Sequence, residues 1–331
     1  MTTIDPVLAE EAARFAAGLD RLLPQGGRVL LAVSGGPDSM ALLTLAAAAG
    51  TPVTVATVDH RLRAEAAHEA SAVAAHCATL GLAHVTLAPD TPPSGASLQA
   101  RAREVRYRLL ADHARDVGAA AIATAHHADD QAETFLMRAA RGSGVAGLAG
   151  VRARARIEGA AVVRPLLDWR RAELRMIVRR AGAPFVDDPA NADPAHDRTR
   201  FRALLNANEW LDPPGLARSA AAMAEADADL HAIADWLWAD RAEADRDEVL
   251  LRAGDLPRTI ARRLLQRGLA AVRAAAGIDR PEWSTATQIE PLLDALAAGR
   301  RATQAGVVVS PRNGTWRLRP APSRSRGARG D

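Results

Sequence analysis

The sequence predicts an α/β fold, in which a parallel sheet carries helices on both faces and a smaller, mainly helical C-terminal domain follows. Four short apolar runs are typical of buried strands: 28–33, 53–58, 83–88 and 119–124. Four helical patterns alternate with them: 38–49, 64–80, 98–117 and 129–140. This alternation favours parallel strands, because parallel neighbours are joined by crossover helices. The length of 331 residues is sufficient for two domains.

The first strand and its helix are joined by Ser34-Gly35-Gly36-Pro37-Asp38-Ser39. Glycines allow positive φ and let backbone N–H groups approach an anion, and the N-terminus of the following helix favours negative charge. The segment is not a Walker loop, because no lysine precedes its final serine. Asp38 supplies an acid instead, which makes sense if Mg²⁺ lies between it and a phosphate. The segment alone is also consistent with a simple tight connection.

Polar residues also follow the second and fourth strands, as Asp59-His60 and His126-His127. Ligands of such sheets bind beyond the carboxyl ends of the strands, so these residues and the 34–39 turn are expected to share one site. His126 and His127 could be zinc ligands, phosphate contacts or loop residues. No His-Glu-x-x-His spacing accompanies them, which disfavours zinc. A fifth strand is predicted at 161–163.

Asp130 and Glu133 are three residues apart in the first turn of a helix, so their carboxylates share a face. Two acids on one face could bind a cation. Asp-x-x-Glu is also a capping box, and the spacing alone favours that interpretation.

Every basic residue in the chain is arginine, and the formal net charge is only +3. Arg103, Arg106 and Tyr107 belong to a charged helical segment that could simply be solvated. Arg198, Arg200 and Arg202 open another helix, where they could form a solvated face or bind RNA phosphates.

From about residue 215 the pattern changes to long alanine-rich helices at 216–243 and 257–276. Asp212-Pro213-Pro214-Gly215 is the predicted hinge. A hairpin is predicted from strands 307–311 and 315–318. The predicted domains are therefore 1–212, 213–320 and a disordered basic tail at 321–331.

The composition excludes several classes of protein. No run of eighteen apolar residues and no secretory leader is present, so a cytoplasmic protein without membrane partners is expected. Cys77 is the single cysteine, which excludes a disulfide framework within the chain and cysteine-rich zinc or iron–sulfur sites. Its helical segment makes it a predicted core residue.

The 34–39 segment resembles the PP-loop of the N-type ATP pyrophosphatases. Six further blocks, in the family's order over roughly residues 28–205, resemble the tRNA(Ile)-lysidine synthetases. These blocks are His126–Thr134, Arg141–Leu148, Asp59–Arg63, Arg164–Leu167, Asp188–Asn191 and the arginines 198, 200 and 202.

The resemblance implies ATP-dependent ligation of free L-lysine to carbon 2 of the wobble cytidine of the CAU-anticodon isoleucine tRNA. The product is lysidine, formed through an adenylated tRNA intermediate, and codon specificity changes from AUG to AUA.

The resemblance also implies roles for individual residues. ATP would lie on the 34–39 turn with Asp59 and His60, and Asp38 would hold Mg²⁺. The implied catalytic residues are Asp38, Arg106, His126, Asp130 and Glu133. Asp130 and Glu133 would bind lysine, leaving Asp129 to cap the helix. Arg198, Arg200 and Arg202 would bind tRNA, together with the C-terminal domain at 213–320.

Two positions depart from the family pattern. Thr199 stands where asparagine is common, and Arg61 stands where glycine is frequent. Another PP-loop ligase or thiolase is an alternative that the missing cysteine pairs and the 126–134 block disfavour. A non-catalytic RNA-binding protein would keep the arginines without needing Asp38. The sequence predicts no oligomeric state.

Overall fold

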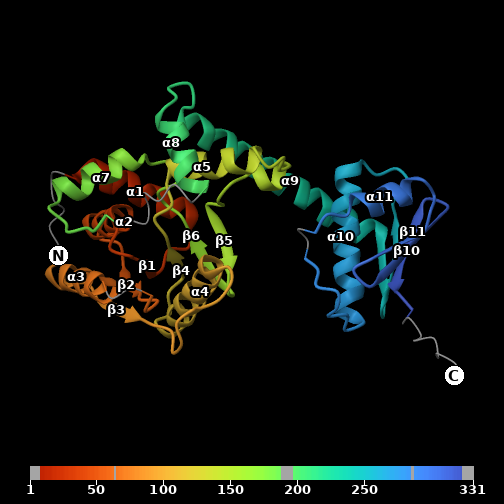
Figure 1. Cartoon of the computed structure of the whole chain (residues 1–331), viewed down its shortest axis with the longest axis horizontal. Helices are drawn as coiled ribbons and strands as arrows, with labels where there is room; N and C mark the ends of the chain where they lie inside the picture. Colours follow the sequence, from red (N-terminus) through yellow and green to blue (C-terminus); the bar gives the residue numbers. More distant parts are fainter. Residues whose placement is uncertain (1–7, 63–64, 188–196, 285–286, 323–331) are drawn as a thin grey trace. The chain divides into compact units, whose positions relative to one another are not determined.

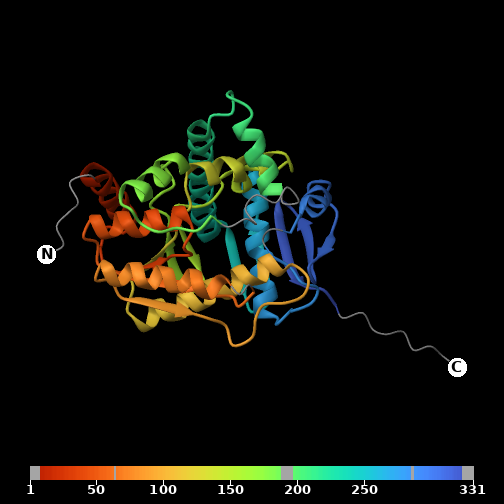
Figure 2. The ribbon, with the colours of Figure 1, turned by 60° about the vertical axis from the view of Figure 1, so that its left-hand side comes forward.

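The computed structural model describes residues 8–62, 65–187, 197–284 and 287–322. The chain forms two compact units, residues 1–225 and 226–331. Figures 1 and 2 show the ribbon in two views, and each unit is described here by itself.

The N-terminal unit is built on a six-stranded sheet with the order β3-β2-β1-β4-β6-β5. Its strands are β1 Val29–Ala32, β2 Val53–Val58, β3 His84–Leu87, β4 Ala121–Ala123, β5 Arg154–Ile157 and β6 Ala160–Val163. All neighbours are parallel except β5, which pairs antiparallel with β6. The order reverses at β1, whose Val29 pairs with Val53 of β2 on one side and Ala121 of β4 on the other. This reversal is the point where such sheets bind ligands.

Helices cover both faces of this sheet (Figures 1 and 2). The helices of this unit before residue 213 are α1 Ala9–Leu22, α2 Pro37–Ala48, α3 Glu65–Thr79, α4 Leu98–Asp116, α5 Ala128–Ala139, α6 Val145–Leu148, α7 Arg171–Arg180 and α8 Asp197–Asn206. Alternation along β1 sends Val29 and Leu31 into the core shared with α1, α2 and α7, and Leu30 into the core shared with α4. Helix α2 is buried from Ser39 to Ala46, so the core holds the start of this helix in place.

The predicted strands and helices of this unit are confirmed with small shifts of their ends, and the predicted strand at 161–163 is β6. Strand β5 was not predicted. Its alternating arginines lack the continuous apolar run of a central strand.

The C-terminal unit combines helices with a five-stranded antiparallel sheet of order β7-β8-β11-β10-β9. Its elements are the end of α9 Pro213–Arg241, α10 Arg258–Ala275, α11 Glu290–Ala297, β7 Ala242–Asp245, β8 Glu248–Arg252, β9 Ala302–Gln304, β10 Val307–Arg312 and β11 Thr315–Pro320. The predicted hairpin is the β10–β11 pair. The mainly helical description is incomplete, because β7, β8 and β9 extend that hairpin into a sheet.

The predicted hinge at 212–215 lies at the start of α9, which continues as one helix to Arg241. Asp212 accepts a hydrogen bond from the Gly215 N–H at 2.8 Å, as a helix-capping residue does. The two compact units divide within α9, between Glu225 and Ala226. The Asp188–Asn191 block, Arg63 and tail residues 323–331 lie outside the described residues.

In the described part of the chain, no helix has the length and apolar character needed to span a bilayer.

Candidate functional site

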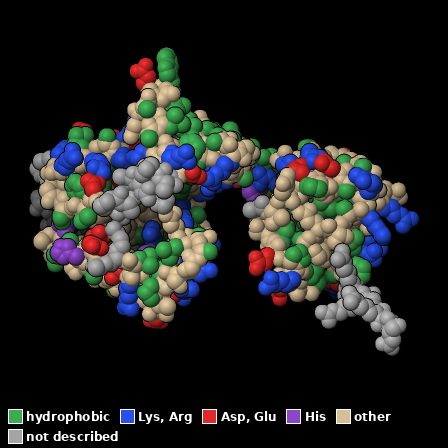
Figure 3. Space-filling model, viewed as in Figure 1, with side chains coloured by type: hydrophobic (Ala, Val, Ile, Leu, Met, Phe, Trp, Pro, Cys, Tyr) green, Lys and Arg blue, Asp and Glu red, His purple; other side chains and the backbone are tan. Residues whose placement is uncertain are grey.

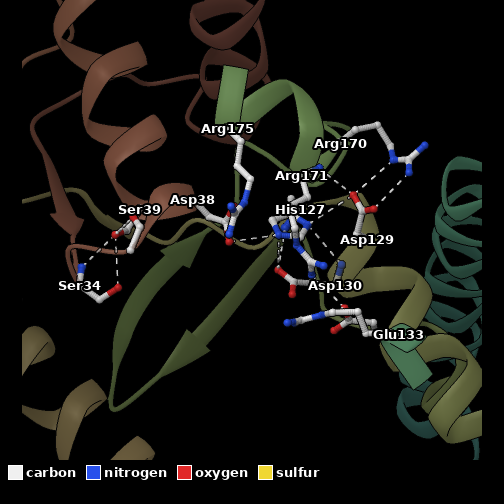
Figure 4. Close-up of polar contacts among 12 residues, drawn as sticks. Ser34, Asp38, Ser39, His127, Asp129, Asp130, Glu133, Arg170, Arg171 and Arg175 are labelled. Atoms are coloured by element: carbon white, nitrogen blue, oxygen red, sulfur yellow. Dashed lines mark hydrogen bonds and ion pairs between the residues drawn. The ribbon is translucent and has the colours of Figure 1, made fainter. Parts of the chain in front are cut away.

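The turn between β1 and α2 has the geometry of an anion-binding loop. Gly35 has a φ of +86°, a conformation that glycine adopts without strain. Gly36 is the N-cap of α2 and Pro37 is its first residue. The hydroxyl of Ser39 accepts from the Ser34 N–H at 3.1 Å and donates to the Gly36 carbonyl at 2.9 Å, which closes the turn (Figure 4). The N-terminus of α2 therefore presents backbone N–H groups at a fixed position.

A cavity of about 560 Å³ lies at the carboxyl ends of β1 and β4. It brings together these residues that sequence analysis had singled out: Ser34, Gly36, Pro37, Asp38, Ser39, Arg106, His126, Asp130, Arg198 and Arg202. A neighbouring cavity of about 340 Å³ shares Ser34, Gly36 and Arg106 with it and adds His60. The 34–39 turn and His126 therefore line one cavity, and His60 lines the neighbouring cavity that shares part of the turn; Asp59 and His127 line neither.

Asp38 lies in the first turn of α2 with its two carboxylate oxygens in different environments. Oδ2 lies 3.4 Å from Nε2 of His127. Oδ1 is buried and accepts no hydrogen bond from any residue that the structure describes. A buried carboxylate oxygen without a partner, beside a phosphate-binding turn, fits a hard divalent cation such as Mg²⁺. Within the described residues, no group of three acidic, histidine or cysteine side chains forms a complete metal cage.

His127 and Asp130 form the capping box of α5. His127 is the N-cap, and its Nδ1 accepts from the Asp130 N–H at 3.3 Å. The Asp130 carboxylate accepts from the His127 N–H at 3.1 Å. The spacing predicted a capping box formed by Asp130 and Glu133, and this prediction is wrong. The capping box of α5 lies three residues earlier and is formed by His127 and Asp130. Burial lowers the pKa of His127, but the carboxylates of Asp130 and Asp38 outweigh burial and raise it above its ordinary value.

His126 differs from its neighbour because it lies among cations. Its Nδ1 is 2.9 Å from the hydroxyl of Thr124. The pKa of His126 is lowered to about 4, mainly by burial. The positive charges of Arg164, Arg198 and Arg103 lower this pKa further, and the carboxylate of Asp130 only partly opposes them. The imidazole is therefore neutral near pH 7.

Glu133 is a buried carboxylate that three arginines share (Figure 4). It is 0% exposed. Its Oε1 accepts from Arg171 at 2.9 Å and from Arg202 at 2.8 Å, and its Oε2 accepts from Arg198 at 2.8 Å. Arg198 also donates to Asp130 at 2.7 Å, so one guanidinium bridges both carboxylates. Burial alone would raise the pKa of Glu133, but these arginines lower it, and the side chain is ionised.

This network determines where the three predicted tRNA-binding arginines lie. Arg198 and Arg202 point to the carboxylates of α5, whereas the Arg200 side chain is 72% exposed and lies 4.0 Å from Asp197. A role for these arginines in tRNA binding, and a role for Asp130 and Glu133 in lysine binding, stay predictions.

Asp129 does not cap its own helix. It accepts from the guanidinium of Arg170 and, at 2.7 Å, from the Arg171 N–H. It therefore stabilises the N-terminus of α7, which corrects the expectation that it caps α5.

Arg171 was not predicted, although it lines the cavity and binds Glu133. Its only sequence signal is an arginine pair, Arg170-Arg171, ahead of an amphipathic helix. Arg175 and Asp187, which pair at 2.5 Å, also line the cavity without having been predicted.

Helix α4 supplies a second basic wall. Arg103, Arg106 and Tyr107 all line the cavity; Tyr107 is buried, whereas both arginines are exposed, so a solvated face and a contact with substrate both stay open for them. The Arg103 guanidinium lies 4.8 Å from the centre of the Tyr107 ring. Burial lowers the pKa of Arg106. Burial and the nearby Arg106 also lower the pKa of His60.

Asp59 has a local role. Its carboxylate accepts from the Arg61 N–H at 2.8 Å and closes the turn after β2. Arg61 itself has a φ of +55°, in the left-handed region that favours glycine. This backbone conformation accounts physically for a glycine preference at this position. Asp59 does not line either cavity, so an ATP contact for it stays a prediction.

Comparisons with known proteins agree with this site. A family described as a PP-loop domain matches residues 8–209. A tRNA(Ile)-lysidine synthase of Novosphingobium aromaticivorans is 46% identical over 95% of this chain and 95% of its own length. The tRNA(Ile)-lysidine synthase of Zymomonas mobilis is 39% identical over 92% of this chain and 91% of its own.

A solved structure, the U34-tRNA thiolase NcsA from Methanococcus maripaludis, shares the fold with a TM-score of 0.54. It is 16% identical and covers 65% of this chain and 76% of its own. At that identity the likeness concerns the fold alone.

Cys77, the single cysteine of the present chain, is buried in the core as predicted. Burial raises the pKa of its thiol to about 11.

Proposed function

The chain belongs to the tRNA(Ile)-lysidine synthase family, and from this premise we propose how its residues carry out the reaction. It is an enzyme that uses ATP to form lysidine in tRNA. We propose that it joins free L-lysine to carbon 2 of the wobble cytidine in the CAU-anticodon isoleucine tRNA. The observation that carries this proposal is one cavity lined by both the 34–39 turn and the α5 carboxylate Asp130.

In the first step, oxygen 2 of the cytosine attacks the α-phosphorus of ATP, and pyrophosphate leaves. The N–H groups of the 34–39 turn hold the phosphates. Asp38 would hold Mg²⁺, and the ion would supply positive charge beside the phosphates. Arg106 supplies positive charge to the α-phosphate region. His126 contributes a hydrogen bond rather than a charge, because its pKa of about 4 keeps it neutral.

In the second step, the ε-amine of lysine attacks carbon 2 of the adenylated base, and AMP leaves with the former oxygen 2. Asp130 and Glu133 orient lysine through its amino groups. Glu133 already accepts from three arginines, so lysine must take the place of at least one guanidinium. Arg198 is the candidate for displacement, because its side chain is 45% exposed and contacts both carboxylates.

Proximity supplies much of the rate, since ATP, lysine and the base must meet in one pocket. We also propose a cytoplasmic reaction, because tRNA and ATP are substrates found there. No specific observation favours a thiolase, which would need reactive cysteines, whereas Cys77 is buried.

The proposal is tested by incorporation of radiolabelled lysine into an unmodified CAU-anticodon isoleucine tRNA transcript with ATP and Mg²⁺. The matched control is the same transcript with another base at the wobble position. Label confined to the cytidine transcript is the expected result. Pyrophosphate release without label would retain the PP-loop chemistry and reject lysine as the nucleophile.

Glu133→Ala tests the lysine role separately. We expect it to raise the lysine concentration required for incorporation while pyrophosphate release with tRNA continues. An unchanged lysine requirement would contradict the role of Glu133 in lysine binding.

A further inference from the structure

Helix α7 directs two arginines, one helical turn apart, toward the cavity. Leu174, Ile177 and Val178 of this helix are buried, and α7 packs against α2, whose N-terminus belongs to the phosphate-binding turn. Arg171 and Arg175 are four residues apart and therefore share one face of α7. Both of them line the cavity.

Arg175 reaches the cavity beside the phosphate-binding turn. Its carboxylate partner is Asp187, with 2.5 Å between Nη2 and Oδ1. The preceding residue, Val186, donates its N–H to the carbonyl of Gly35 at 3.0 Å, so Asp187 is one residue away from a direct contact with the turn. In Figure 4 the Arg175 side chain extends from α7 toward Asp38, at the start of α2. The guanidinium group therefore lies at the phosphate end of the cavity.

The two arginines of α7 differ in how firmly they are held. Arg171 donates to Glu133, whose side chain is 1% exposed. The side chains of Arg175 and Asp187 are 34% and 58% exposed, so water competes for their ion pair. An exposed pair of this kind is weak, and its guanidinium can exchange one anionic partner for another. Arg175 can therefore turn to an anion in the cavity at little cost.

The phosphate-binding turn contains no cationic side chain. In Walker loops a lysine ahead of the final serine or threonine reaches the β- and γ-phosphates, but Asp38 stands at that place here. The backbone N–H groups of the turn supply only partial positive charge. Figure 3 shows a hollow in the N-terminal unit with blue side chains at its rim, all of which are arginine in this chain. Side-chain charge for the phosphates must therefore come from arginines of other elements.

We propose that Arg175 is a catalytic residue of the first step, which binds the β- and γ-phosphates of ATP and then the pyrophosphate that leaves. In this step oxygen 2 of the cytosine bonds to the α-phosphorus, the bond from that phosphorus to the bridging oxygen breaks, and this oxygen leaves with the electron pair. Negative charge thus increases on pyrophosphate, and the forked donors of a guanidinium stabilise it. Arg175 exchanges Asp187 for the phosphates when ATP binds. This role rests on the first step of the proposed function, and lysine plays no part in it.

The test measures the binding of pyrophosphate and of AMP to the full chain by isothermal titration calorimetry, at one fixed concentration of Mg²⁺. Arg175→Met should bind pyrophosphate about 10- to 100-fold more weakly, because hydrogen bonds between charged groups are lost. AMP lacks the β- and γ-phosphates and should bind as it does to the wild type. The matched control is Arg180→Met, on the same helix and 38% exposed, which pairs with Glu11 outside the cavity. It should leave both affinities unchanged.

Asp187→Asn separates a phosphate contact from a role in holding the turn. The substitution removes the carboxylate that competes for the guanidinium, so pyrophosphate should bind about 2- to 5-fold more tightly. In the double variant with Arg175→Met this gain should disappear. Weaker binding of pyrophosphate by both single variants would overturn the role of Arg175, because the pair would then only support the turn. Wild-type affinity for pyrophosphate in Arg175→Met, or an equal loss of affinity for AMP, would overturn it as well.

Activity distinguishes this role from the proposed function. If the wild type releases pyrophosphate in the presence of tRNA but incorporates no lysine, the proposed lysine transfer fails and the role of Arg175 stands. If the wild type incorporates lysine and Arg175→Met releases pyrophosphate at the wild-type rate, the role of Arg175 fails and the proposed function stands.

Discussion

Replacing Glu133 by glutamine tests whether the carboxylate holds the site together. The substitution keeps the size of the side chain and removes the charge that Arg171, Arg198 and Arg202 share. Removing one partner from a buried ion pair costs about 3–5 kcal/mol, because the remaining charges are left uncompensated. The Glu133 side chain is only 1% exposed, so solvent cannot replace it.

The assay is thermal unfolding of the full chain. For a unit of this size each kcal/mol shifts the midpoint by about 2–4 °C, so Glu133→Gln is expected to lower the transition of the N-terminal unit by roughly 6–20 °C. The matched control is Asp112→Asn, which removes the exposed partner of Arg115 on α4. An exposed pair contributes less than about 1 kcal/mol, so the control should shift the midpoint by no more than about 4 °C.

A shift for Glu133→Gln no larger than that of the control would refute the reasoning. It would mean that the arginine side chains turn toward solvent and become hydrated without a cost in the free energy of unfolding. A double-mutant cycle with Arg202→Met adds a second measure, and a coupling near zero would lead to the same conclusion.

Three further outcomes are expected. Asp38→Ala should abolish tRNA-dependent pyrophosphate release while tRNA binding in a filter assay persists; release at the wild-type rate would remove Asp38 from the phosphate site. Stability should fall on acidification, because burial holds the pKa of His126 at about 4, below the 6.5 of the unfolded chain. Its contribution is complete above pH 6.5 and decreases toward pH 4 by up to roughly 3 kcal/mol. The urea midpoint of His126→Gln should therefore vary less over this interval, and an unaltered pH profile would contradict the assignment. Asp129→Asn should cost about 1–2 kcal/mol in urea unfolding, because it weakens the cap of α7 and the pair with Arg170; a neutral effect would show that α7 starts without this cap.

The central strands and the anion-binding turn were predictable because their signals are local. Buried parallel strands are continuous apolar runs, and a glycine pair ahead of a helix predicts the turn. Short strands with mixed composition, such as β5 and β9, carry no such signal. They form because β6 and β10 have backbone groups free to pair with them at the edge of the sheet.

The electrostatics of the site were not predictable from spacing. Arg171 and Arg202 reach Glu133 from 38 and 69 residues away, and no local pattern indicates that they converge on one carboxylate. The two histidines illustrate the same limit. They are adjacent in sequence, yet tertiary contacts shift the pKa of His126 down and that of His127 up.

The burial of α2 gives the cavity two walls of different physical character. The phosphate-binding turn belongs to an apolar core, whose cohesion depends on temperature in the way that hydrophobic burial does. The opposite wall, where α8 meets α5, depends on guanidinium–carboxylate pairs. Guanidinium chloride competes for these pairs as an arginine analogue, whereas urea carries no charge. Guanidinium chloride is therefore expected to weaken the wall formed by α8 more strongly than urea does, relative to the turn that the core holds in place.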